Sequence, residues 1–162
     1  MRGRLIIFCG IPGCGKTTVA RIAAQRLPNA ILIQTDAVRA MLAHQSFSRE
    51  ESKFVYEGCM AVAREALRGG YTVLLDGTFM REDYRNEARD KLGRYSAGVD
   101  VVYVACSLAT ALRRNATRKA SIPPDKLKSI YERFEVPRRA LRIDSTRLRP
   151  ADAAAKVAAA LS

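Results

Sequence analysis

The residues most able to do chemistry lie near the amino terminus, in the run Gly10, Ile11, Pro12, Gly13, Cys14, Gly15, Lys16 and Thr17. This run matches G-x-x-x-x-G-K-[ST], the pattern of a phosphate-binding loop, at every fixed position. Glycines let the backbone curl around phosphate groups, so that main-chain N–H groups can bind the oxygens. In such a loop Lys16 reaches the β- and γ-phosphates, the Thr17 hydroxyl binds Mg²⁺, and we add Thr18 to the nucleotide-binding set. The alternative is a glycine-rich turn without a ligand.

Two carboxylates follow apolar runs and are candidates for the reacting site. Asp36 comes after the run at 30–34 and is our candidate base, accepting the proton of an acceptor hydroxyl; a helix N-cap is the alternative role. Asp76 ends the run at 71–75, a pattern typical of the second carboxylate that holds Mg²⁺ or its waters. We also place Asp76 among the substrate-binding residues. Its alternative is a turn residue at a strand end.

Arginines supply the remaining part of a phosphoryl-transfer site. Arg114 and Arg118 stand four apart in a helix predicted over 108–119, so both would project from one side of it. There they would bind the nucleotide, and Arg118 would stabilise charge on the moving phosphoryl group. The alternative is a solvent-exposed helix face.

Apolar runs and helical spacing predict the elements that position these groups. Short apolar runs indicate strands, and segments with period 3.6 indicate helices. The strands are predicted over 5–9, 30–34, 71–75, 99–106 and 139–143. The helices are predicted over 18–26, 37–43, from a capping box of Ser48 and Glu51 up to 68, and over 81–92, 108–119, 125–134 and 151–161. The long third helix should bury Val55, Cys59, Val62, Ala63, Ala66 and Leu67.

This alternation predicts an α/β fold, with a parallel five-stranded sheet and helices on both faces. Ligands bind at the carboxyl edge of such sheets, where the phosphate loop, Asp36 and Asp76 would meet. We expect one P-loop kinase domain over 1–162, of three layers and adenylate-kinase-like, with a short arginine-bearing lid over about 108–124.

The composition limits the class of protein, but it does not identify the molecule that accepts the phosphate. The net charge is +12, and residues 113–149 carry 12 basic and 4 acidic side chains. Such charge fits a nucleic acid partner or an ordinary solvated surface equally well. The four cysteines form no C-x-x-C pair and are interpreted as buried thiols of a cytoplasmic protein. No apolar run is long enough to span a membrane.

These motifs resemble the kinase module of the bacteriophage and bacterial 5′-hydroxyl polynucleotide kinases, within the zeta-toxin-like and AAA-type small P-loop kinases. The resemblance covers residues 1 to about 137 and rests on the phosphate loop, Thr35 to Arg39, Leu75 to Thr78, Arg114 to Arg118, and residues 122–137. It implies that Asp36 is the general base and that Arg39 grips a phosphate of the acceptor strand. Residues 77–85 do not align with the family, which leaves acceptor contacts in 77–95 open.

The leading hypothesis is therefore an ATP- and Mg²⁺-dependent kinase acting on the 5′-hydroxyl end of RNA or DNA. A second hypothesis keeps the kinase and replaces the acceptor with a sugar, an antibiotic or a nucleotide-like metabolite. A third is an NTP-hydrolysing switch or binding protein. The absence of N-K-x-D, and of a Glu after Asp76, argues against the third.

Overall fold

The five strands form one parallel sheet with the order β2-β3-β1-β4-β5. The computed structural model describes residues 2–118 and 121–161. The strands are β1 (Leu5–Cys9), β2 (Ala30–Gln34), β3 (Thr72–Asp76), β4 (Val99–Ala105) and β5 (Leu141–Asp144). The helices are α1 (Lys16–Arg26), α2 (Thr35–Arg39), α3 (Arg49–Arg68), α4 (Glu82–Leu92), the 3₁₀ turn η1 (Gly93–Tyr95), α5 (Leu108–Ala116), α6 (Pro124–Arg133) and α7 (Pro150–Leu161).

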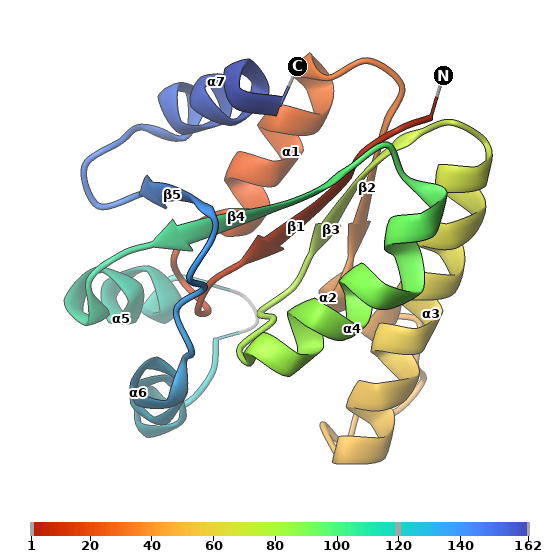
Figure 1. Cartoon of the computed structure of the whole chain (residues 1–162). Coiled ribbons are helices and arrows are strands. Elements are labelled where there is room, and N and C mark those ends of the chain that lie inside the picture. Colours follow the sequence, from red (N-terminus) through yellow and green to blue (C-terminus); the bar gives the residue numbers. More distant parts are fainter. Residues whose placement is uncertain (1, 119–120, 162) are drawn as a thin grey trace.

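Helices cover both faces of the sheet, as predicted (Figure 1). Strand β1 is fully buried, and its side chains alternate between two apolar clusters. Ile6 and Phe8 pack with α1 and α7, whereas Leu5 and Ile7 pack with α3 and α4. The central strand is thus held from both sides, which fixes the start of the phosphate loop that follows it.

The predicted strands and helices all exist, with shifts at several boundaries. Strand β3 begins one residue later than predicted and ends at Asp76, which pairs in register with Phe8 and Gln34. Helix α3 begins after Ser48, whose hydroxyl accepts a hydrogen bond from the Glu51 N–H at 3.1 Å, which is one half of the predicted capping box. The other half does not form, because the Ser48 N–H donates to the Ser46 hydroxyl and the Glu51 carboxylate accepts from the N–H groups of Ser46 and Phe47. On α3 the assignment of Val62 to the buried face is wrong: it is 55% exposed, and Met60 is buried instead.

Helix α5 is shorter than predicted, with a consequence for the lid. It ends at Ala116 because the buried Asn115 side chain exchanges two hydrogen bonds with the Ile122 backbone, at 2.8 and 3.1 Å. These bonds tie Ile122 to the last turn of α5. The end of the predicted helix, at Lys119, lies outside the described residues. Arg118 is therefore beyond the last turn of α5, and the prediction that Arg114 and Arg118 share one helix face is wrong.

Candidate active site

The phosphate loop joins β1 to α1 at the centre of the sheet's carboxyl edge. All three of its glycines adopt backbone conformations that other residues avoid. Gly13 has φ +83°, and a Cβ there would lie 2.5 Å from the carbonyl oxygen of Ala111. Gly15 has φ +85° and directly precedes α1. The loop therefore presents the first turn of α1, with its free N–H groups and positive dipole end, to an anion.

Lys16 and Thr17 are the first two residues of α1, and both are half-buried. Within the described residues Lys16 has no carboxylate partner, so its ammonium group is free for phosphate oxygens. The Thr17 hydroxyl donates a 2.7 Å hydrogen bond to Asp76 Oδ2. Thr17 and Asp76 are 59 positions apart in the sequence, and they are in direct contact, as their predicted places at the carboxyl edge of the sheet indicate.

Asp76 is the most buried carboxylate of the candidate site. It is 3% exposed, and its Oδ2 also accepts a 3.1 Å hydrogen bond from the Gln34 side chain. Its Oδ1 is buried and has no hydrogen-bond partner in the part of the chain that the structure describes. An unsatisfied carboxylate oxygen beside a threonine hydroxyl suits Mg²⁺, which takes few protein ligands and keeps waters and phosphate oxygens.

Gln34 is a site residue that sequence reasoning missed. It is the last residue of β2 and lies in register with Asp76 on the neighbouring strand. Its amide holds the Asp76 carboxylate in place from the side opposite the phosphate loop. The signal was available, because a polar residue ending an apolar strand next to a site carboxylate is placed at the functional edge of the sheet.

Asp36 lies at the same edge but in a different setting. It is exposed and stands in the first turn of α2. Gln34, not Asp36, occupies the N-cap position, and no side chain caps this helix. The cap alternative for Asp36 is therefore wrong. Within the described residues its carboxylate has no hydrogen bond or ion pair, which leaves it available to an acceptor hydroxyl.

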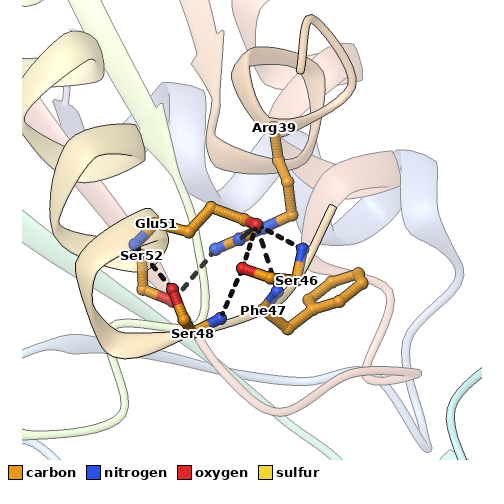
Figure 2. Close-up of polar contacts among 6 residues, drawn as sticks. All are labelled: Arg39, Ser46, Phe47, Ser48, Glu51 and Ser52. Atoms are coloured by element: carbon orange, nitrogen blue, oxygen red, sulfur yellow. Dashed lines mark hydrogen bonds and ion pairs between the residues drawn. The ribbon is translucent and has the colours of Figure 1, made fainter. Parts of the chain in front are cut away.

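Arg39 is the last residue of α2, and its guanidinium is already paired with a carboxylate of the protein. Its guanidinium forms an ion pair with Glu51 and donates a 3.3 Å hydrogen bond to the Ser52 hydroxyl (Figure 2). The structure thus places Arg39 on the same short helix as Asp36, but with its charge balanced from α3. A role for Arg39 in gripping an acceptor phosphate would require this pair to open.

Arg114, on α5, contacts the backbone of the phosphate loop directly. It donates hydrogen bonds to the Cys14 carbonyl at 3.4 Å, the Ser145 hydroxyl at 3.1 Å and the Ser145 carbonyl at 2.8 Å. The Ser145 hydroxyl in turn donates to the Cys14 carbonyl at 2.6 Å. Arg114 and Ser145 therefore fix the loop's backbone against the segment that follows β5. Arg118 is exposed and belongs to none of these contacts.

Cys14 is a buried residue of the phosphate loop, and its thiol is unreactive. Burial raises the pKa of its thiol, and the nearby Lys16 charge opposes that shift only in part. Burial likewise raises the pKa of Cys9 to about 12 and that of Cys106 to about 11. These thiols stay protonated near neutral pH, so they act as small apolar side chains and not as nucleophiles.

A buried arginine, unforeseen from the sequence, connects two segments next to the site. The Arg85 side chain is fully buried and donates to the carbonyls of Phe79 at 2.6 Å and Glu135 at 2.7 Å. It also pairs with Glu82, whose N–H donates to the Glu135 carboxylate at 2.7 Å. Arg85 shares a helix face with Ala88 and Leu92, which was the signal for its burial. The segment after β3 is thereby fastened to the segment after α6.

An open cleft of about 490 Å³ lies on the other side of the phosphate loop, at the ends of β4 and β5. One loop residue, Ile11, lines it, together with Tyr103, Ser107, Phe134 and Thr146. Because β1 is central, the loop separates this cleft from the β2–β3 side that carries Asp36 and Asp76. The cleft and the two candidate carboxylates therefore lie on opposite sides of the loop.

Known proteins resemble this chain in sequence and in fold. The model of the family described as AAA domain matches residues 5–142. The L-seryl-tRNA(Sec) kinase of Methanococcus maripaludis is 28% identical over 141 residues, covering 82% of this chain. The chain spans about half of that relative's length, 53%.

Two solved structures show the same fold. The APS kinase CysC of Mycobacterium tuberculosis, solved with AMPPNP and APS, has a TM-score of 0.80 at 21% identity and covers 96% of this chain and 95% of its own. A gluconokinase from Sinorhizobium meliloti has a TM-score of 0.68 at 20% identity and covers 99% and 95%. Among the described residues, no helix combines the length and apolar character that crossing a bilayer requires.

Proposed function

We propose, from the premise that this chain belongs to the AAA domain family and has the fold of small P-loop kinases, that it transfers the γ-phosphate of ATP to a hydroxyl group of a small molecule. The observation that carries the choice of acceptor is the pairing of Arg39 with Glu51. The arginine that would hold a strand phosphate in a polynucleotide kinase is neutralised here by the protein itself. Two of the fold neighbours, the APS kinase and the gluconokinase, are also kinases named for small molecules.

The donor would be held by groups already aligned for phosphate. The N–H groups of the loop and the Lys16 ammonium bind the phosphate chain, and Arg114 keeps the loop backbone in place. Thr17 and Asp76 would hold Mg²⁺, which neutralises phosphate charge when bound. The nucleoside part would extend toward the cleft beside Ile11.

The acceptor would enter on the β2–β3 side. Its hydroxyl lies against Asp36, which removes the proton as oxygen attacks the γ-phosphorus; the bond to the bridging oxygen of ADP breaks. The exposed Asp36 is free to make this contact. We assign Arg118 to closure over the transferred group, because it follows α5, the helix whose Arg114 contacts the phosphate loop. The whole chain acts as one kinase domain with this lid.

A second candidate keeps the chemistry and places the hydroxyl on a nucleic acid. The net charge of +12 and the name of the M. maripaludis relative, an L-seryl-tRNA(Sec) kinase, favour it. The acceptor would then be a 5′-hydroxyl end or a hydroxyl carried by RNA. Its phosphates would have to find cations other than Arg39, such as the exposed Lys126.

The experiment that separates the two uses γ-labelled ATP, Mg²⁺ and a panel of hydroxyl compounds beside a 5′-hydroxyl oligoribonucleotide, the matching oligodeoxyribonucleotide and a 5′-phosphorylated control. The proposal predicts label on one or more small compounds and none on the strands. Label on hydroxyl-ended strands alone would support the second candidate. ATP turnover without label on any acceptor would instead indicate a hydrolase.

A further inference from the structure

The pair formed by Arg39 and Glu51 is almost closed to solvent. The two side chains are 13% and 9% exposed. In Figure 2 the Arg39 side chain extends from α2 to the first turn of α3. There its second terminal nitrogen donates a 3.3 Å hydrogen bond to the Ser52 hydroxyl. Solvent screens such a pair far less than the exposed ion pairs of this chain, so its two charges compensate each other effectively.

Glu51 is held in this position by more than the arginine. Its Oε2 accepts hydrogen bonds from the Ser46 N–H, from the Ser46 hydroxyl at 2.8 Å and from the Phe47 N–H at 3.1 Å. Burial alone raises the pKa of Glu51, but the bonds from Ser46, Arg39 and Phe47 outweigh it and lower the pKa. The carboxylate is therefore charged near neutral pH, and both of its oxygens are in use.

The outer side of this group is an aromatic ring. Phe47 is 59% exposed, and its ring centre lies 5.0 Å from the Arg39 guanidinium and 5.4 Å from the Lys126 ammonium of α6. Asp36 and Arg39 stand three apart on α2, hence on one side of that helix. The Phe47 ring thus lies against the Arg39 guanidinium, which is at the same time paired with Glu51.

We propose that Glu51 is a positioning residue that sets acceptor specificity through Arg39. By holding and neutralising the guanidinium, Glu51 withholds it from a phosphate or carboxylate on the acceptor, and the site takes neutral hydroxyl compounds. The proposal rests on the proposed function in one respect, since it takes the side of Asp36 as the acceptor side. It identifies the substrate class as uncharged next to the reacting hydroxyl.

The test compares two probes that differ by one phosphate, uridine and uridine 3′-phosphate. The protein is saturated with AMPPNP and Mg²⁺, so that the phosphate loop is filled, and binding is followed by NMR titration. Glu51→Gln should bind uridine 3′-phosphate about 10-fold more tightly than the unmodified protein does, the gain expected of one freed charged hydrogen-bond donor. Uridine binding should change by less than about 2-fold.

Two double variants assign the gain to the arginine. In Arg39→Gln/Glu51→Gln the gain should vanish, whereas in Lys126→Gln/Glu51→Gln, which removes the other cation of the Phe47 ring, it should remain. No gain in Glu51→Gln, an equal gain for both probes, or a gain that survives loss of Arg39 would overturn the proposal. AMPPNP affinity and melting temperature report whether each variant is folded.

A measurement on the unmodified protein guards against a variant that does not fold. The Arg39 side-chain Nε–Hε signal should not shift when uridine 3′-phosphate is added, because Glu51 retains the guanidinium. A shift that saturates with the probe would show that an anion takes Arg39 directly and would overturn the proposal. Failure of the proposed function would show differently, as AMPPNP binding without label transfer from ATP to any acceptor.

Discussion

The two halves of the carboxyl edge are built in different ways. Around the phosphate loop the polar groups are buried or half-buried and already paired within the protein: Thr17 donates to Asp76 at 2.7 Å, Ser145 donates to the Cys14 carbonyl at 2.6 Å, and Arg114 donates to the Ser145 carbonyl at 2.8 Å. On the α2–α3 side the base candidate is exposed, and the connection between the helices carries exposed apolar residues, with Met41 83% and Phe47 59% exposed. In the proposed function, this difference means that backbone shape specifies the donor site and a few side-chain pairs specify the acceptor site.

This contrast has a physical reason. A nucleoside triphosphate presents the same phosphate chain to every enzyme, so glycines, a lysine and a helix terminus can bind it in a fixed form. Acceptors differ from enzyme to enzyme, and a single charge that is present or neutralised near the base can discriminate between charged and uncharged acceptors. The Arg39–Glu51 pair, made between two helices, is the kind of feature that can change while the phosphate loop stays the same.

Lys16→Ala breaks the donor half most severely. Loss of the ammonium group should lower phosphoryl transfer by at least about 10²–10³-fold, because it stabilises charge on the moving phosphoryl group. The measurement is label transfer from γ-labelled ATP, with folding checked by circular dichroism. Arg21→Ala, at an exposed position of the same helix, should leave the rate unchanged. Normal turnover in Lys16→Ala would falsify the assignment of the donor site.

Asp36→Asn tests the acceptor half. If Asp36 is the base, kcat should fall by roughly 10²–10⁴-fold while ATP affinity stays within about 2-fold. Steady-state kinetics and ATP-analogue titration measure the two quantities. Asp90→Asn replaces another exposed aspartate on α4 and serves as the control. An equal loss of turnover and ATP affinity would mean that Asp36 supports the fold and does no proton chemistry.

Arg114→Ala sharpens the description of the donor half as a braced loop. Removing the guanidinium leaves the Ser145 carbonyl without this donor and loosens the Cys14 segment. ATP binding should weaken by about 10-fold, the effect of losing one charged hydrogen bond. Arg113→Ala, its exposed neighbour, provides the comparison. If both variants bind ATP normally, Arg114 does not support the loop.

Alkaline pH gives the smallest effect and tests the buried thiols. Burial raises the pKa of Cys59 from 9.0 to about 11, so the folded chain keeps a proton that the unfolded chain releases above pH 9. Stability from this group is present below pH 9 and lost as the pH rises toward 11, by about 1.4 kcal/mol per pH unit at most. Urea unfolding between pH 8 and 10.5 should show the decline. A shallower decline is expected in Cys59→Ala, and an identical one would contradict the assignment.

Sequence reasoning reached most of the fold because the strands are apolar runs separated by helical patterns. It also found Thr17 and Asp76, since strand ends meet at one edge. It could not find the partners of the two arginines, because no sequence pattern links them. Ser145 is 31 residues from Arg114, and Glu51 is 12 residues from Arg39. Glu51 was assigned to a capping box, a local role that concealed its long-range one.

The segment predicted as a lid shows a second kind of limit. Helical spacing carried the predicted helix past residue 116, and only the hydrogen bonds between Asn115 and Ile122 end it there. Periodicity describes what a segment can form by itself, and a buried amide that closes a loop overrides it. Arg118 was thereby assigned to a helix face that does not exist.

The central claim is that this chain phosphorylates a small hydroxyl compound. The most direct test incubates the purified protein with Mg²⁺, γ-labelled ATP, and sugars, nucleosides and other neutral polyols, beside 5′-hydroxyl and 5′-phosphorylated oligonucleotides. The account predicts label on a neutral small acceptor, lost in Asp36→Asn, and no label on any strand. Label on both 5′-hydroxyl strands, with none on small compounds or on the 5′-phosphorylated control, would contradict it and establish a polynucleotide kinase.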